Sequence, residues 1–139
     1  MLIRSAFAAL LLSLLAFMPA AVAQDKDDPI IAFAKARLKD PTKAFTLTVT
    51  VSVKEGANAK FEAAFAKALV ATRKEKGCIA YDLNRDSTDG NRYVVYERWK
   101  SLADLDAHLK SDHLKALRVV LGEVIAGAPD LAILLPASE

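Results

Sequence analysis

One histidine stands out as the residue best suited to chemistry on a small molecule. The imidazole of His108 titrates near neutral pH, so it can accept a proton from a weakly acidic substrate. Asp104 stands four residues earlier, one helical turn away, where its carboxylate would orient the ring. The alternative is a structural histidine on a helix surface or in a capping network.

Two further candidates, Glu97 and Trp99, stand two residues apart in an apolar run and share one face if that run is a strand. The indole of Trp99 would stack on a flat substrate, or else fill the core at the end of the strand. A carboxylate inside an apolar strand must be paired or exposed. An ion pair of Glu97 with an arginine such as Arg92 or Arg85, or a contact across a dimer interface, is therefore the favoured alternative to a contact with substrate.

Three aromatic residues complete the candidate set, as walls of a pocket or as members of the core. The predicted catalytic residues are His108 and Trp99, and the predicted substrate-binding residues are Tyr81, Glu97, Phe61 and Phe65.

The sequence contains no cofactor motif: no glycine-rich nucleotide loop, no phosphate loop and no paired cysteines. His108 and His113 are five residues apart, about 140° around an ideal helix, so they do not form a helical metal pair. Asp104, His108 and Asp112 could share a face, but a helix break near Ser111 weakens that pattern. We therefore expect no cofactor and no metal.

The elements that position these residues follow from periodicity. Alternation over 45–53 predicts a strand with one apolar face and one hydroxyl-bearing face, which we expect to be semi-buried because it carries no charge. Asn58 is expected to cap a helix that ends at Gly77 in a left-handed conformation. The predicted strands are 45–53, 79–85, 92–99 and 131–135, and the predicted helices are 58–76 and 102–126, the second broken near Ser111. This order is a ferredoxin-like β-α-β-β-α-β arrangement of the α+β class.

The N-terminus has the features of a secretory signal peptide. Arg4 precedes an apolar run that is shorter than a membrane span, and Ala21-Val22-Ala23 is a small-x-small cleavage site. We expect cleavage after Ala23, a secreted or periplasmic protein, and no membrane span after cleavage. The predicted domains are a signal peptide at 1–23, an extension with a short helix at 24–44, and one folded domain at 45–136.

The charge pattern excludes one class of partner. The formal net charge is +2, without a basic block, so there is no footprint for nucleic acid. Cys78 is the single cysteine, so it cannot form an internal disulfide and is expected to be buried.

The segment from Gly77 to His113 resembles the antibiotic biosynthesis monooxygenase family. The matching features are Gly77-Cys78-Ile79-Ala80-Tyr81, an aromatic strand ending in Glu97-Arg98-Trp99, and a following helix with His108. The resemblance covers about Phe45 to Leu135. It implies a homodimeric α+β barrel in which each protomer keeps its own pocket.

The resemblance also implies a function, cofactor-independent oxygenation of a quinol-like or polycyclic phenolic substrate. Such a substrate, once deprotonated, can pass one electron to triplet dioxygen, and the radical pair then recombines. The partners would be a small aromatic substrate and O2. Relatives that degrade haem place an asparagine on the first strand, whereas Thr48, Val49 and Thr50 occupy those positions here. This difference disfavours haem degradation.

Two non-enzymatic alternatives stay open at this point. One is a dimeric module that binds a small molecule or haem, with His108 as an axial ligand. The other is a stress-response or interaction domain whose pocket is vestigial. A cleft shared by Trp99 and His108 would favour the enzyme.

Overall fold

The computed structural model describes residues 27–137, so the expected signal peptide and its cleavage site at Ala23 lie outside the described residues. The elements in chain order are α1 (Pro29–Lys35), β1 (Phe45–Ser52), α2 (Asn58–Thr72), β2 (Cys78–Arg85), β3 (Arg92–Trp99), α3 (Leu102–Leu109), α4 (Asp112–Val124) and β4 (Asp130–Leu134). From β1 onward they follow the predicted ferredoxin-like order, with the second helix in two pieces. None of the helices within residues 27–137 is both long and apolar enough to cross a bilayer.

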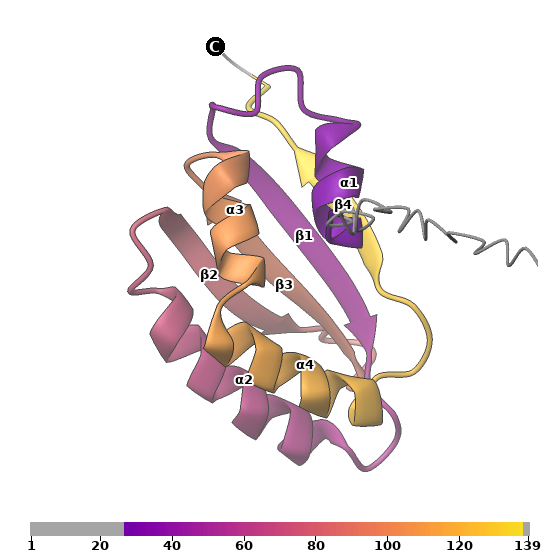
Figure 1. Ribbon diagram of the computed structural model, residues 1–139. Coiled ribbons are helices and arrows are strands. Elements are labelled where there is room, and N and C mark those ends of the chain that lie inside the picture. Colours follow the sequence, from indigo (N-terminus) through magenta and orange to yellow (C-terminus); the bar gives the residue numbers. More distant parts are fainter. Residues whose placement is uncertain (1–26, 138–139) are drawn as a thin grey trace, which may run out of the picture.

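The four strands form one antiparallel sheet in the order β2-β3-β1-β4. All four described helices lie on the same face of this sheet (Figure 1). The fold is therefore a two-layer α+β structure, and its core lies between the sheet and the helices.

Strand β1 distributes its side chains as alternation predicts. Phe45, Leu47 and Val51 point toward the helices and are buried. The hydroxyl-bearing face points away from the helices, where Thr48 lies opposite Tyr96 on β3 and both are partly accessible. On β1 this helix-free face carries hydroxyls and no charge, whereas the neighbouring strands add exposed charged residues to it, such as Arg98 opposite Thr46 and Asp130 opposite Thr50.

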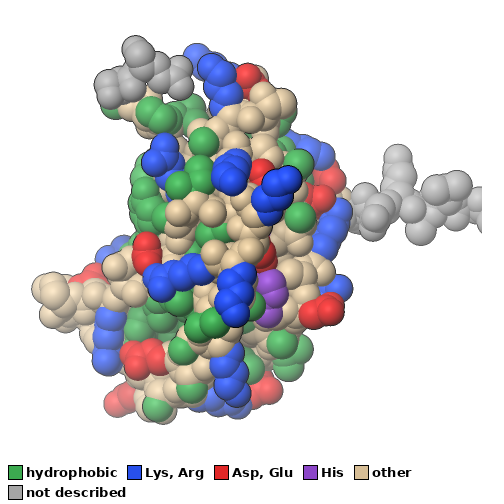
Figure 2. Space-filling model, turned by 90° about the vertical axis from the view of Figure 1, so that its left-hand side faces the viewer, with side chains coloured by type: hydrophobic (Ala, Val, Ile, Leu, Met, Phe, Trp, Pro, Cys, Tyr) green, Lys and Arg blue, Asp and Glu red, His purple; other side chains and the backbone are tan. Residues whose placement is uncertain are grey.

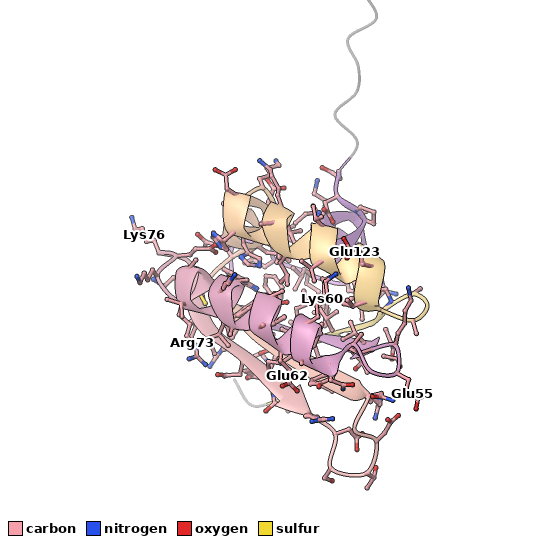
Figure 3. All side chains as sticks on the ribbon, turned by 90° about the horizontal axis from the view of Figure 1, so that it is seen from below. Glu55, Lys60, Glu62, Arg73, Lys76 and Glu123 are labelled. Atoms are coloured by element: carbon pink, nitrogen blue, oxygen red, sulfur yellow. The ribbon has the colours of Figure 1, made fainter. Side chains whose placement is uncertain are left out.

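Helices α2 and α4 lie side by side across the inner face of the sheet (Figure 3). Lys60 on α2 forms an ion pair with Glu123 on α4. Ser111 separates α3 from α4, and its hydroxyl accepts a hydrogen bond from the backbone amide of Leu114. The predicted break at Ser111 is thus a helix N-cap.

Two local predictions are wrong. Ala57 is the N-cap of α2, and Asn58 instead donates to the carbonyl of Gly90 (2.8 Å) and the hydroxyl of Tyr93 (2.9 Å). Gly77 is not left-handed, because the helix ends earlier, at Thr72. At Asn58 the cause is the long-range contact with the β2–β3 hairpin, which local capping rules do not include.

Gly77 is required for a close approach between the start of β2 and the start of α3. A Cβ atom at this position would lie 2.2 Å from the Cβ of Asp104. Gly77→Ala is therefore expected to lower the free energy of unfolding by about 1–3 kcal/mol, the usual cost of overpacking. Urea unfolding followed by circular dichroism measures this change.

The matched control is Gly122, which lies inside α4, where an alanine methyl group would meet no other part of the described chain within 4 Å. Gly122→Ala is expected to raise stability by about 0.5–1 kcal/mol, because alanine is the better helix former. Equal effects at the two glycines would contradict the close-approach argument.

Candidate active site

A small cavity of ≈ 80 Å³ lies between the inner face of the sheet and the helices, with walls from α1, α2 and α4 as well as the end of α3. Most of its wall is apolar, from residues such as Val49, Phe61 and Phe65. The polar side chains in the wall are Tyr81, Glu97, His108 and Arg118. An apolar cavity with a few convergent polar groups is typical of a small-molecule site.

His108, in the last turn of α3, is held on one side by a carboxylate that the sequence does not suggest. Its side chain is 1% exposed, and its Nδ1 lies 3.1 Å from both carboxylate oxygens of Glu75. An ionised carboxylate only accepts hydrogen bonds, so Nδ1 carries the proton in the neutral ring. Nε2 is then the unprotonated nitrogen of a ring that forms part of the cavity wall.

Burial lowers the pKa of His108 below its usual value, and the neighbouring Glu75 opposes this shift. The neutral imidazole is therefore the main form at neutral pH, as a general base requires. The prediction that Asp104 orients the ring of His108 is wrong. The carboxylate of Asp104 instead accepts a hydrogen bond from the hydroxyl of Ser101 at 2.6 Å.

Glu97 enters the cavity from the middle of β3, and its residue is 6% exposed. The predicted ion pair with Arg92 or Arg85 is wrong, since Arg92 pairs with Asp86 and Arg85 with Glu62. Instead, the indole nitrogen of Trp99 donates to Glu97 Oε2 at 3.0 Å. Burial raises the pKa of Glu97 to about 7, against the lowering effect of that hydrogen bond.

Trp99 is fully buried and packs on His108, with ring centroids 4.6 Å apart. It is not part of the cavity wall. Its indole therefore contacts two of the polar side chains of the cavity wall, His108 and Glu97. In this position it supports their geometry, and the structure does not place it against a substrate.

The remaining predicted substrate-binding residues, Tyr81, Phe61 and Phe65, all line the cavity. Phe65 stacks on Tyr81 with ring centroids 5.6 Å apart, and the rings of Tyr81 and His108 meet edge to face at 5.3 Å. Burial raises the pKa of Tyr81 well above its usual range, so its hydroxyl stays neutral. Cys78, expected from the sequence to be buried, is only half-buried, and it lies outside the cavity wall.

One wall of the cavity comes from the N-terminal extension. Ile30 on α1 lines the cavity beside Arg118 of α4. Asp28, which caps α1 through the amide of Ile30 at 2.9 Å, also pairs with Arg118 at 2.7 Å. The sequence alone does not indicate what α1 covers, and the structure shows that it covers this side of the cavity.

The family of the protein follows from comparison with known proteins. The family model described as antibiotic biosynthesis monooxygenase matches residues 44–119. The chain belongs to this family. The matched range contains Glu97 and His108 but begins after α1, so Ile30 belongs to a part of the cavity wall outside it.

Relatives agree with this assignment. The chain is 37% identical over 71 residues to the candidate monooxygenase Rv0793 of Mycobacterium tuberculosis, covering 51% of this chain and 69% of the relative. It is 36% identical over 70 residues to the candidate quinol monooxygenase YgiN of Escherichia coli, covering 44% of this chain and 67% of that protein.

Solved structures share the fold. The structure of Rv0793 superposes with a TM-score of 0.65 at 27% identity, covering 70% of this chain and 98% of that one. A candidate antibiotic biosynthesis monooxygenase from Caulobacter crescentus gives a TM-score of 0.67 at 28% identity, covering 71% and 94% of the two chains. Membership of the family supports a monooxygenase-like function.

Proposed function

We propose that this protein is a cofactor-independent monooxygenase that oxidises a quinol-like or polycyclic phenolic substrate with O2. The observation that carries the proposal is the pairing of Glu75 with His108 Nδ1, which leaves Nε2 as a base in the wall of a largely apolar, partly aromatic cavity. A carboxylate that fixes the tautomer and orientation of a catalytic histidine is a recurring arrangement in enzymes.

The chemical steps need only a base, a dry pocket and O2. His108 takes a proton from the substrate, and the resulting anion passes one electron to O2. The substrate radical and superoxide combine into a peroxide, which takes the proton back from the imidazolium. Where the oxygenated carbon still carries a hydrogen, loss of water leaves a carbonyl, so that CH2 and O2 become C=O and H2O.

Glu97 has a separate part in this scheme. With a pKa of about 7, a large fraction of its carboxyl groups is protonated at neutral pH. A protonated carboxyl in the cavity can donate a hydrogen bond to the substrate oxygen that becomes negative. The apolar wall keeps water from competing for that contact.

The size of the cavity bears on how a substrate enters. A cavity of about 150 Å³ holds benzene, whereas this one is ≈ 80 Å³. Even one aromatic ring therefore requires a wall to move, and α1, with seven residues, is the shortest helix that contributes to it. A polycyclic phenol and haem are both larger than one aromatic ring, so the cavity volume does not discriminate between the proposed substrate and the alternative of a haem-binding module.

The test is oxygen consumption by purified protein with a panel of reduced naphthoquinones, benzoquinones and anthrones. We expect uptake above the rate of spontaneous oxidation and one ¹⁸O atom from ¹⁸O2 in the product. Product without ¹⁸O would indicate an oxidase that releases peroxide, and uptake equal to the protein-free rate across the panel would contradict the proposal.

A further inference from the structure

Three side chains converge outside the cavity, where α3 meets α4. Oε1 of Glu75 lies 3.1 Å from His108 Nδ1 and 2.6 Å from His113 Nε2, and one ligand atom from each residue lies within 4.8 Å of the others. On one continuous helix the two histidines would point about 140° apart, but the break at Ser111 turns the chain and brings their ring centroids within 5.9 Å. The proposed reaction has no use for His113.

We propose that Glu75, His108 and His113 bind a divalent first-row transition ion, with zinc as the reference ion. Two imidazoles and one carboxylate form a ligand set that such ions accept, with a fourth position open to water. Bonds of about 2.0–2.1 Å in a tetrahedron place ligand atoms about 3.3 Å apart. The observed separations lie within about 1.5 Å of that spacing, so modest side-chain adjustments admit the ion.

The burial of the three residues suits an ion that enters from solvent. His108 is the inner ligand at 1% exposure, whereas the side chains of Glu75 and His113 are 21% and 26% exposed. Histidine surface is visible at the exterior between charged side chains in Figure 2. Neither Glu75 nor His113 lines the cavity, so the ion would lie one imidazole away from the substrate.

The backbone holds the ligands in place before any ion binds. Glu75 stands in a turn in which its amide donates to the carbonyl of Thr72 and its carbonyl accepts from the amide of Cys78, at 3.0 and 3.1 Å. The absence of a side chain at Gly77 lets this turn approach α3, which carries His108. Ligands on a fixed turn and on two helix ends lose little conformational freedom on binding.

A bound ion would change what His108 offers to the cavity; this step rests on the proposed function. The ion takes the lone pair of Nδ1, so the proton of the neutral ring moves to Nε2. Nε2, the base of the proposed reaction, then donates a hydrogen bond and no longer accepts a proton. The ion is therefore expected to inhibit turnover.

The binding test uses tag-free protein and two probes, Co²⁺ followed by visible absorption and Zn²⁺ followed by calorimetry. We expect one ion per chain with a tetrahedral cobalt spectrum. Glu75→Gln and His113→Asn should each weaken binding by at least about tenfold. Asp112→Asn is the control, because this exposed neighbour pairs with Lys115 and does not belong to the cluster of ligand atoms.

Each outcome has a defined meaning. Absence of saturable binding, or unchanged affinity in His113→Asn with its circular dichroism intact, would overturn the metal site. Where oxygen uptake is measurable, zinc should suppress it in the wild-type protein and spare it in His113→Asn. Activation by the ion would overturn the inhibitory role. Because the cobalt spectrum needs no substrate, the metal site can stand even if the proposed reaction fails.

Discussion

Replacing His108 by glutamine is expected to lower kcat/KM for quinol oxidation by about 10²–10⁴-fold, the usual contribution of a positioned general base. Glutamine keeps a polar side chain in contact with Glu75 but cannot accept the substrate proton. The loss should appear mainly in kcat, because the aromatic walls that bind the substrate remain. Steady-state oxygen uptake, corrected for spontaneous oxidation, measures the change.

Two comparisons make this result specific. Asp112→Asn, in the first turn of α4 and outside the cavity wall, should stay within about threefold of wild type. A large loss in Glu97→Gln with near-normal activity in His108→Gln would identify Glu97 as the base and contradict our assignment. Thermal unfolding of each variant separates loss of chemistry from loss of fold.

The residues of the cavity that the sequence predicts are those whose position follows from local periodicity. Period-two alternation places Tyr81 and Glu97 on the inner face of the sheet, and the spacing of Phe61 and Phe65 places both on the inner stripe of α2. These rules determine which face a side chain occupies. They do not determine how far along the strand the cavity extends, so the sequence leaves Trp99 either against a substrate or in the core, and the structure places it outside the cavity wall.

The contact between Glu75 and His108 cannot be predicted from the sequence, because no local pattern indicates it. It stands in a polar turn after α2, and its approach to His108 depends on the packing of Gly77 against Asp104. In the sequence, Asp104 is the nearer acidic neighbour of His108 along a helix. In the structure, Asp104 instead contacts Ser101 at the N-cap of α3, and Glu75 contacts the imidazole of His108. One available signal is the glycine itself, since a glycine can indicate a close approach of the backbone as well as a left-handed turn.

The two titrating groups of the cavity have opposite effects on stability. Burial lowers the pKa of His108, so its desolvation costs stability as pH falls below the unfolded value of about 6.5. Burial raises the pKa of Glu97, so its desolvation costs stability as pH rises. The two groups therefore destabilise the folded protein least when both are neutral. This is also the state that the proposed reaction requires.

Glu97→Gln is expected to become more stable than wild type as pH rises from about 5 to 8. The carboxyl has a pKa near 4.5 in the unfolded chain and about 7 in the folded protein, so the folded state holds the extra proton between these values. Unfolding free energy then falls with pH in wild type and reaches its full penalty above about pH 7. The shift corresponds to as much as about 3 kcal/mol, which the neutral amide avoids while its oxygen still accepts from Trp99.

Urea unfolding of both proteins at several pH values measures this difference, and subtracting the two curves removes the contribution of His108 that they share. Glu123→Gln is the control, because Lys60 holds the pKa of that exposed carboxyl below its usual value. Its difference from wild type should therefore be flat between about pH 5 and 8. A flat difference for Glu97→Gln as well would mean that Glu97 ionises as it does in water. The cavity would then lack the dry, low-dielectric character on which the proposed oxygenation depends.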